Sequence, residues 1–393
     1  MMEHGTFLPL TCDSMIPIYT PYLTKNTIKY ATDAIESGWI SSHGKYKKMA
    51  EDLLCEQFDC NHALLVSNGT CATHLLAKAL RSKHPNINKI IAPNNCYVAA
   101  WNSFLFDGYD WKISLIDSSL NTWNADYSSV KADENTAFLI VPNLGNMINV
   151  SKLKKLYPKS VFVEDNCEGF FGLYNNKRAG SESECISLSF FGNKDLTSGE
   201  GGAVLTSDSN IYEYIKKIHN QGQSEKRYVH DEMGYNYRMT NIQAAILYGQ
   251  LQDSEEIKEK KHDIFKIYRE GLKGISNISF QDTGANAHSN WMFGIRIHNS
   301  LGNEHALRYF KENKIETRPM FYPASAHGYL KNHKQIEFGS EINSTILNRE
   351  CLILPSFPSL SKEELKYIIE IVKKYATNSK TVFAQGENKN DRY

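Results

Sequence analysis

The stretch SFFGNKDLTSGEGG, residues 189–202, joins the end of an apolar run to a lysine and then to a glycine-rich segment. The run CISLSFF (185–191) is continuous rather than alternating, which is typical of a strand buried on both faces. The glycines allow the backbone to adopt positive φ and to approach a ligand closely. The stretch therefore predicts a buried strand that ends beside Lys194, either in a backbone-dominated binding turn or in a mobile surface hairpin.

Similar apolar runs precede and follow this stretch, and segments with helical spacing lie between many of them, for example over 70–81 and 150–157. Strands that alternate with helices predict a largely parallel sheet covered by helices on both faces. The last two runs are close enough along the chain to pair as a hairpin. The seven runs are ALLVS (63–67), KIIAP (89–93), KISLID (112–117), AFLIVP (137–142), VFVED (161–165), CISLSFF (185–191) and AVLTS (203–207).

From about residue 208 the pattern becomes helical, with one long candidate helix over 240–272. Weaker strand runs and two helical stretches, 303–313 and 361–375, follow and predict a smaller α+β domain. The fold class is therefore predicted as α/β, with a mostly parallel sheet of seven strands in the larger domain. The predicted divisions are a large domain over 1–255 that includes an N-terminal extension (1–15), a small domain over 256–376, and a polar tail over 377–393.

Composition restricts the class of protein. The 393 residues are 41% hydrophobic and 22% charged, which is typical of a globular protein, and Lys plus Arg equals Asp plus Glu at 44 each. A balanced charge gives no field that favours nucleic acid or an anionic membrane. The eight cysteines are scattered without a C-x-x-C pair, and the N-terminus lacks a secretion-signal pattern. We expect a soluble, cytoplasmic protein without a metal site, a nucleic-acid partner or a membrane anchor.

Four predicted strand ends carry residues that suit a ligand site, because ligands bind at the carboxyl ends of strands in open α/β sheets. Gly69 and Thr70 open a helix, where free N–H groups and the helix dipole favour a phosphate. Asp165 ends an apolar strand, Tyr97 lies at a strand-to-helix junction, and Lys194 follows a third strand. Taken singly, each also fits an ordinary structural role: Gly69 and Thr70 a helix cap, Asp165 a solvated strand end, Tyr97 a core aromatic and Lys194 a surface lysine.

Together these four features match the requirements of pyridoxal 5'-phosphate. That cofactor needs a lysine for its covalent attachment and an acid that keeps its pyridine nitrogen protonated. It also needs an aromatic face for its ring and an anion site for its phosphate. The combination favours Lys194 as a nucleophile rather than a surface lysine.

Six ordered motifs carry a resemblance to a known family over about residues 16–375. With these motifs the chain resembles the DegT/DnrJ/EryC1/StrS family of sugar aminotransferases, which have the fold type I, aspartate-aminotransferase-like architecture. Within the family it looks most similar to perosamine synthases, which aminate C4 of a nucleotide-linked 4-keto-6-deoxyhexose. The motifs are SGWISSHGKY (37–46), SNGTCATHL (67–75), VEDNCEGFFG (163–172), SFFGNKDLTSGEGG (189–202), GYNYRMTNIQAAI (234–246) and LPSFPSL (354–360).

The resemblance implies a role for each residue near the cofactor ring. Lys194 is implied as the residue that bonds to the cofactor and afterwards shuttles protons. Asp165 is implied to pair with the pyridine nitrogen, and Tyr97 to stack on the ring. Glu168 stands where the family usually has glutamine or histidine, near the ring hydroxyl.

The resemblance also implies a phosphate site and a homodimer with shared active sites. Gly69, Thr70 and Ser189 are implied to hold the phosphate, joined by Asn236 from the other subunit. Arg318 and Tyr322, in the segment IETRPMFYP (315–323), are weaker candidates for binding the sugar nucleotide or the carboxylate of the amino donor.

The implied reaction transfers an amino group from L-glutamate to a nucleotide-diphosphate-linked 4-keto-6-deoxyhexose, giving a 4-amino-4,6-dideoxy sugar. The alternatives are a 3-aminotransferase or a 3-dehydratase of a keto-sugar nucleotide and, less favoured, a non-enzymatic regulator. Dehydratases of the family typically carry histidine in place of the attached lysine, which disfavours that alternative here. The chain departs from the family pattern at VPNLGN (141–146) and at His327, which lies a little beyond the usual position of a histidine. The identities of the sugar and of the nucleotide base are therefore left open.

Overall fold

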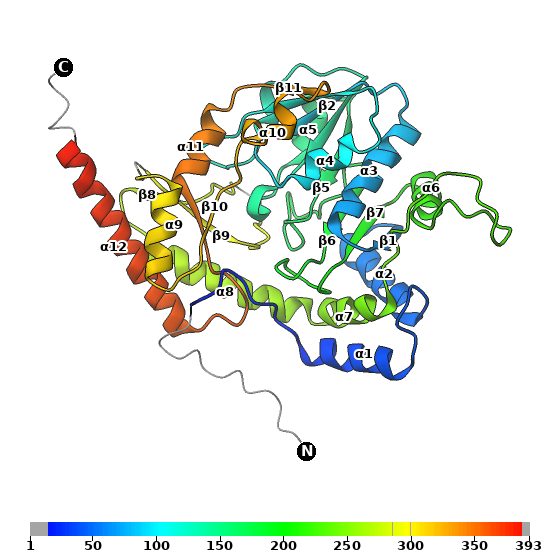
Figure 1. Cartoon of the computed structure of the whole chain (residues 1–393), viewed down its shortest axis with the longest axis horizontal. Helices are drawn as coiled ribbons and strands as arrows, with labels where there is room; N and C mark the ends of the chain where they lie inside the picture. The colour runs from blue at the N-terminus through cyan, green and yellow to red at the C-terminus, as the bar shows by residue number, and fades with distance from the viewer. Residues whose placement is uncertain (1–14, 285, 299, 387–393) are drawn as a thin grey trace.

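The computed structural model of the chain describes residues 15–284, 286–298 and 300–386, so the predicted N-terminal extension lies almost wholly outside the described residues. Figure 1 shows the elements, coloured along the chain. The first half contains α1 (Lys25–Glu36), α2 (Lys45–Phe58), β1 (His62–Val66), α3 (Gly69–Lys83), β2 (Lys89–Pro93), α4 (Ala99–Leu105), β3 (Lys112–Ile116), β4 (Thr136–Ile140), α5 (Val150–Leu156), β5 (Val161–Asp165), β6 (Ile186–Ser189), β7 (Gly202–Thr206) and α6 (Ser209–His219).

The second half begins with two long helices and continues as short strands and helices. It contains α7 (Asn241–Gln252), α8 (Ser254–Leu272), β8 (Ile278–Ser279), β9 (Phe293–Ile297), α9 (Asn303–Glu312), β10 (Arg318–Pro319), α10 (Gly328–Lys331), β11 (Ile336–Phe338), α11 (Ile342–Glu350), β12 (Cys351–Leu354) and α12 (Lys362–Gly386). None of the helices within the described residues is long and apolar enough to cross a membrane.

The large sheet contains all seven predicted strands and an eighth that was not predicted. Its order is β1-β7-β6-β5-β4-β2-β3-β11, and only β7 runs antiparallel to its neighbours. The predicted hairpin is formed by β6 and β7, with Ser189 opposite Gly202. The prediction of seven strands is corrected to eight, because β11 joins from the C-terminal region and pairs in parallel with β3.

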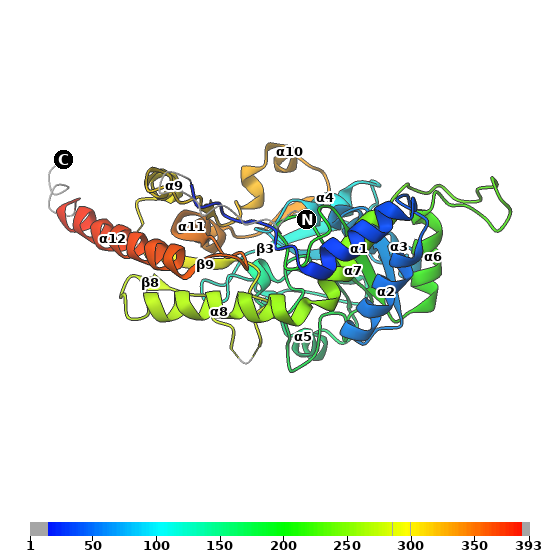
Figure 2. The ribbon, with the colours of Figure 1, turned by 90° about the horizontal axis from the view of Figure 1, so that it is seen from below.

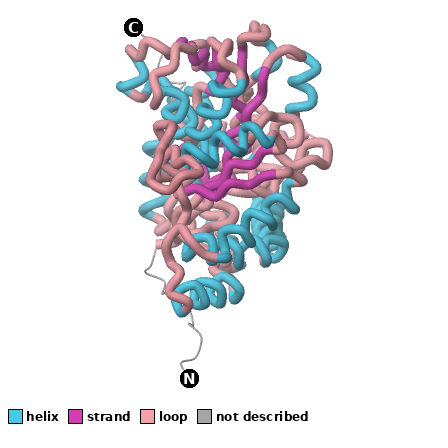
Figure 3. The backbone as a smooth tube through the Cα atoms, turned by 90° about the vertical axis from the view of Figure 1, so that its right-hand side faces the viewer, coloured by secondary structure: helices cyan, strands magenta, loops and turns pink. Residues whose placement is uncertain are grey.

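Two apolar layers bury the two faces of this sheet, because successive side chains of a strand point to opposite sides. Leu65 and Phe138 belong to the layer covered by α2, α5 and α7, whereas Leu64 and Leu139 belong to the layer covered by α3, α4 and α6. Figure 3 shows the strands in the middle of the molecule with helices on either side. The continuous apolar runs in the sequence thus follow from burial on both faces.

The C-terminal region has its own four-stranded antiparallel sheet, with the order β10-β12-β9-β8, and a separate apolar core with α8, α9 and α12. Figure 2 shows α12 along the outer side of this region. The candidate helix over 240–272 is two helices, because the chain breaks at Asp253, whose Oδ1 accepts a hydrogen bond of 2.7 Å from Asn26 Nδ2. Residues 377–386 of the predicted polar tail are helical, because no proline or glycine interrupts α12 before Gly386.

The division into domains stays a prediction, and the chain crosses between the two sheets more than once. Ala324 and Leu330 pack into the core of the large sheet, although they follow β10 of the small sheet. The chain then contributes β11 to the large sheet before it returns to β12. This return places the segment around residues 318–327 against the carboxyl ends of the large-sheet strands.

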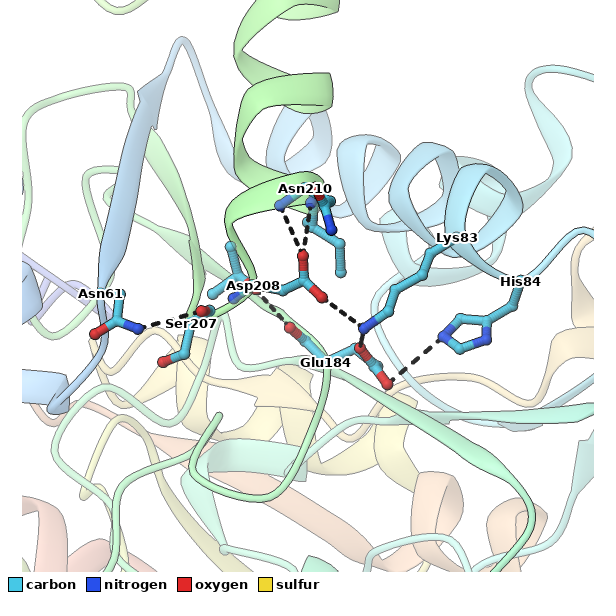
Figure 4. Close-up of polar contacts among 9 residues, drawn as sticks. Asn61, Lys83, His84, Glu184, Ser207, Asp208 and Asn210 are labelled. Atoms are coloured by element: carbon cyan, nitrogen blue, oxygen red, sulfur yellow. Dashed lines mark hydrogen bonds and ion pairs between the residues drawn. The ribbon is translucent and has the colours of Figure 1, made fainter.

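A cluster of charged side chains joins three elements at the edge of the sheet opposite those carboxyl ends (Figure 4). Lys83, in the last turn of α3, forms ion pairs with Glu184 and with Asp208, the latter at 2.7 Å. Asp208 also caps α6, because its Oδ1 accepts the N–H groups of Asn210 and Ile211. The cluster therefore ties α3 to the start of β6 and to α6.

Replacing Lys83 with methionine should lower the free energy of unfolding by about 1 kcal/mol at neutral pH, since the pairs are partly exposed. Burial alone lowers the pKa of Lys83, but Asp208 and Glu184 raise it overall. Lys83 in turn lowers the pKa of Asp208. The pKa of Glu184 is lowered mainly by His84 and, to a smaller extent, by Lys83. The difference in the free energy of unfolding between wild type and Lys83→Met should therefore be present between about pH 4 and about pH 10. It should be lost outside this window.

Urea unfolding of the wild type and of Lys83→Met across this pH range measures the loss of stability. Lys152→Met is the control, because Lys152 is exposed and makes no ion pair within the described part of the chain. An equal loss in both variants, or a loss that persists at low pH, would contradict the role of the cluster.

Candidate active site

One cavity of about 820 Å³ lies at the carboxyl ends of the large-sheet strands and is closed on one side by the segment around β10. It brings together nine of the ten residues predicted from the sequence, which are Gly69, Thr70, Tyr97, Asp165, Glu168, Ser189, Lys194, Arg318 and Tyr322. Residues from five elements and their following turns therefore meet in one place, although they are separated by more than 250 positions in the chain.

Lys194 lies in the turn after β6, and its backbone is fixed on both sides. Its N–H donates to Phe191 O at 2.9 Å, and its carbonyl accepts the hydroxyl of Tyr19 at 2.9 Å. Its Nζ lies 4.0 Å from the ring centroid of Trp291. The lysine is therefore held in a wall of the cavity and is not a mobile surface side chain.

The first turn of α3 forms an anion site with β6. Asn68 caps the helix by accepting the N–H of Cys71 at 2.9 Å, whereas the N–H groups of Gly69 and Thr70 have no partner among the residues that the structure describes. A Cβ on Gly69 would lie 2.7 Å from Ser189 Cβ, so only glycine permits this close approach. Unsatisfied N–H groups, the helix dipole and a nearby hydroxyl together suit a phosphate.

Asp165 lies at the end of β5 and is 6% exposed. Its Oδ1 accepts the N–H of Cys167 at 3.2 Å and the hydroxyl of Ser187 at 3.5 Å. The hydroxyls of Ser187 and Thr73 are 2.9 Å apart, which ties the strand to α3. Both of these hydrogen bonds are to Oδ1, and Asp165 lines the cavity, so Oδ2 is available to a ligand there.

Glu168 lies in the turn after β5 and is 4% exposed. Its Oε2 accepts the N–H of Leu144 at 2.8 Å, and Leu144 has a positive φ of 58° within the segment VPNLGN. Burial raises the pKa of Glu168 to about 7, although the charge of Lys194 and the Leu144 N–H oppose this shift. Glu168 can therefore donate or accept a proton near neutral pH.

The open side of the cavity carries the larger polar and aromatic side chains. Tyr97 precedes α4 and is 60% exposed, with its ring centroid 6.4 Å from that of Phe321. Arg318 is held beside Glu316 by an ion pair of 2.5 Å, and Tyr322 is half-exposed. Flat rings and a guanidinium at the mouth are the groups that bind a nucleotide base and its phosphates.

Asn236 is the one predicted residue that does not line this cavity. It is exposed, and its Oδ1 accepts a hydrogen bond of 2.8 Å from Arg238 Nη2. The tyrosines on either side fix its position, since Tyr235 donates to Asp107 at 2.9 Å and the hydroxyl of Tyr237 lies 3.0 Å from His74 Nδ1. Asn236 therefore does not line the cavity of its own chain.

Several cavity residues were not predicted from the sequence. Trp291 and Asn193 line the cavity, and neither is among the site residues predicted from the sequence. His327 also lines the cavity, and burial lowers its pKa. Asn193 adjoins the predicted lysine and could have been found by that proximity, whereas Trp291 reaches the site only through the folding of a distant segment.

The residues present fit pyridoxal phosphate. The two free N–H groups at the start of α3 match its phosphate, the free oxygen of Asp165 matches its pyridine nitrogen, and Lys194 matches its aldehyde. An α/β fold with a mostly parallel sheet and this set of groups at the strand ends defines a pyridoxal-phosphate-dependent enzyme of fold type I.

The chain belongs to the DegT/DnrJ/EryC1/StrS aminotransferase family, which it matches over residues 21–373. It is 32% identical over 367 residues to the GDP-perosamine synthase of Escherichia coli O157:H7, covering 92% of this chain and 98% of the other. It is 33% identical over 370 residues to the GDP-perosamine synthase of Vibrio cholerae, covering 92% and 99%.

The fold is similar to that of solved sugar aminotransferases. The structure of Helicobacter pylori PseC, an aminotransferase involved in the biosynthesis of pseudoaminic acid, superposes with a TM-score of 0.84 at 21% identity. The match covers 93% of this chain and 100% of that one.

Proposed function

We propose that this protein transfers the amino group of L-glutamate to C4 of a guanosine-diphosphate-linked 4-keto-6-deoxyhexose, giving the 4-amino-4,6-dideoxy sugar nucleotide. The observation that carries the proposal is the meeting of Lys194, the free oxygen of Asp165 and the phosphate site of α3 in one cavity. The similarity to two GDP-perosamine synthases over nearly the whole chain supports the sugar and the guanine base.

The proposed mechanism assigns one task to each side chain. Pyridoxal phosphate, when bound, supplies an electron sink that allows an amino group to pass from donor to acceptor. Lys194 Nζ would hold the cofactor covalently and, when released, would carry the proton to and from the substrate carbon. Asp165 Oδ2 would accept a hydrogen bond from the protonated pyridine nitrogen, and Glu168 would share a hydrogen bond with the ring hydroxyl.

The remaining residues bind and orient. The N–H groups of Gly69 and Thr70 and the hydroxyl of Ser189 bind the cofactor phosphate, and Tyr97 packs against the ring. Arg318 and Tyr322, at the mouth, bind the diphosphate and base of the sugar nucleotide or the carboxylate of the donor. Lys194 favours transamination over 3-dehydration, because a lysine that bonds again to the cofactor returns it to its starting state after each transfer.

The reaction is tested by incubating the purified protein and cofactor with a panel of nucleotide-linked keto sugars and amino donors. The panel varies the base (guanine, thymine, uracil), the position of the keto group (C3, C4) and the donor, and mass spectrometry detects the product. We expect the guanosine-diphosphate 4-keto sugar with L-glutamate to turn over at least tenfold faster than the other combinations. Faster turnover of a 3-keto sugar would overturn the assignment of C4.

We further propose that the protein is a homodimer in which Asn236 of each subunit binds the cofactor phosphate of the other. The support is that Asn236 is exposed and lies outside its own cavity, on a segment fixed by Tyr235 and Tyr237. The loop after α6, which precedes this segment, projects from the body in Figures 1 and 2. It carries Tyr228 and Met233, which are 79% and 87% exposed, as is typical of a surface that a partner covers.

Asn236→Ala should weaken cofactor retention about tenfold, by loss of about one hydrogen bond to a charged group, and leave the fold intact. Mixing inactive Lys194→Ala subunits with inactive or weakened Asn236→Ala subunits should restore part of the activity. One of the two shared sites in such a heterodimer carries both wild-type residues. Absence of recovery in heterodimers verified by mass would place Asn236 in its own subunit's site or in none.

A further inference from the structure

Ser289 lies between β8 and β9, is 1% exposed and is not among the residues that line the cavity. Its hydroxyl donates a hydrogen bond of 2.6 Å to Asp195 Oδ2, one position after Lys194. The same oxygen accepts the N–H of Phe171 at 2.9 Å, three positions after Glu168. One buried side chain therefore joins the two turns that carry Lys194 and Glu168.

The backbone of Ser289 contacts a third turn. Its N–H donates to the carbonyl of Gly145 at 2.8 Å, and Gly145 follows Leu144, whose N–H donates to Glu168 Oε2. Gly145 has a positive φ of 90°, and a Cβ there would lie 2.7 Å from Glu168 O and 2.8 Å from Ser289 Cβ. Only glycine allows this conformation and this approach, which brings the segment of Ser289 against the turn of Glu168.

The Asp195 end of this connection is buried as well. Asp195 is 4% exposed, and burial raises its pKa to about 6, whereas the charge of Lys261 and the Ser289 hydroxyl lower it. Asp195 is therefore mostly ionised at neutral pH, and the distance of 2.6 Å is typical of a hydroxyl that donates to a carboxylate. Trp291 adds a second contact with the same turn, since its Nε1 donates to Asn193 O at 2.7 Å.

We propose that Ser289 is a positioning residue that fixes the separation between Lys194 and Glu168, and with it the affinity for pyridoxal phosphate. The inference rests on the proposed function, in which Lys194 would hold the cofactor covalently and Glu168 would share a hydrogen bond with its ring hydroxyl. These two contacts form together only when the two turns keep one separation. The Ser289 hydroxyl fixes this separation before binding, because it is bonded to both turns, and a site held in its bound geometry binds more tightly.

The test is a double-mutant cycle on the affinity of the full-length, cofactor-free chain for pyridoxal phosphate, measured by absorbance titration. Ser289→Ala removes both hydrogen bonds of the hydroxyl and should weaken binding about tenfold, since the contact of Glu168 with the ring hydroxyl is then lost. Glu168→Ala removes this contact directly, so the separation of the two turns no longer affects binding. In the Glu168→Ala chain, Ser289→Ala should therefore weaken binding less than twofold.

Ser356→Ala is the matched control for a purely structural role. Ser356 is 0% exposed and does not line the cavity. Its hydroxyl also makes one bond of each kind, since it donates to Leu354 O at 2.6 Å and accepts the N–H of Phe293 at 2.8 Å. Ser356→Ala should lower the melting temperature of the cofactor-free chain, as Ser289→Ala does, but should change the affinity less than twofold with or without Glu168.

Three results would overturn the proposal: an unchanged affinity in Ser289→Ala, a loss of equal size in the Glu168→Ala chain, or an equal loss in Ser356→Ala. If Ser289→Ala does not fold, Ser289→Cys replaces it in the cycle, because cysteine keeps a side chain of similar size and a weaker donor. Its loss of affinity should be smaller, about threefold, and should depend on Glu168 in the same way. The titration uses no sugar and no amino donor, so a failure of the proposed reaction leaves its outcome unaffected.

Discussion

Lys194→Ala is expected to give a protein that is folded but colourless after pyridoxal phosphate is added and excess is removed. The wild type should be yellow, because its amine bonds to the cofactor aldehyde. Turnover should fall at least about 10³-fold, since the variant loses both the covalent attachment and the group that moves the proton. Absorbance spectra and initial rates measure the two effects.

Two controls separate the chemistry of Lys194 from its charge and from general effects of lysine removal. Lys194→Arg keeps a cation above Trp291 but cannot form the bond, so it should also lose the colour. Lys152→Ala removes an exposed lysine that does not line the cavity and should retain both colour and turnover. A yellow, active Lys194→Ala protein would place the nucleophile at another residue.

Asp165→Asn should retain the cofactor but slow turnover by about 10²- to 10³-fold, the usual effect of removing one preorganised charge from a buried site. The amide keeps the contacts with Cys167 N and Ser187 only in part, and its neutral oxygen no longer holds the pyridinium proton. The KM for the sugar nucleotide should change little, because Asp165 lies at the strand end and not at the mouth of the cavity.

The matched comparison for Asp165→Asn is Glu168→Gln, which removes the other buried carboxylate of the cavity. Glu168 accepts a hydrogen bond from the backbone N–H of Leu144, which an amide oxygen can also accept. Turnover of Glu168→Gln should therefore fall by less than about tenfold. Unchanged turnover of Asp165→Asn together with a large loss in Glu168→Gln would show that the roles of the two carboxylates are reversed.

The strand ends could be predicted from the sequence, because their signals are local. Continuous apolar runs followed by glycine or by a polar residue identified the turns that carry Gly69, Asp165 and Lys194, and all of these line one cavity. The close approach of Gly69 to Ser189 explains why a glycine stands at that position. Burial on both faces of the sheet made these signals strong.

Features that depend on distant contacts were not predicted. Strand β11 is only three residues long (Ile336–Phe338), too short for its apolar–polar alternation to stand out in the sequence, and its pairing with β3 places it in the sheet. The break between α7 and α8 lies at Asp253, which a residue of α1 fixes. Lys261 Nζ donates a hydrogen bond to the backbone carbonyl of Trp291, 30 positions further along the chain, and no spacing in the sequence indicates this contact.

The central claim is tested most directly by following labelled nitrogen into the product. The purified protein is supplied with pyridoxal phosphate, a guanosine-diphosphate 4-keto-6-deoxyhexose and L-glutamate that carries an isotopic label on its amino nitrogen. We predict that nuclear magnetic resonance of the product will show the labelled nitrogen bonded to C4, with 2-oxoglutarate formed in equal amount. Label at C3, or a deoxygenated sugar that contains no labelled nitrogen, would contradict the assignment of this protein as a 4-aminotransferase.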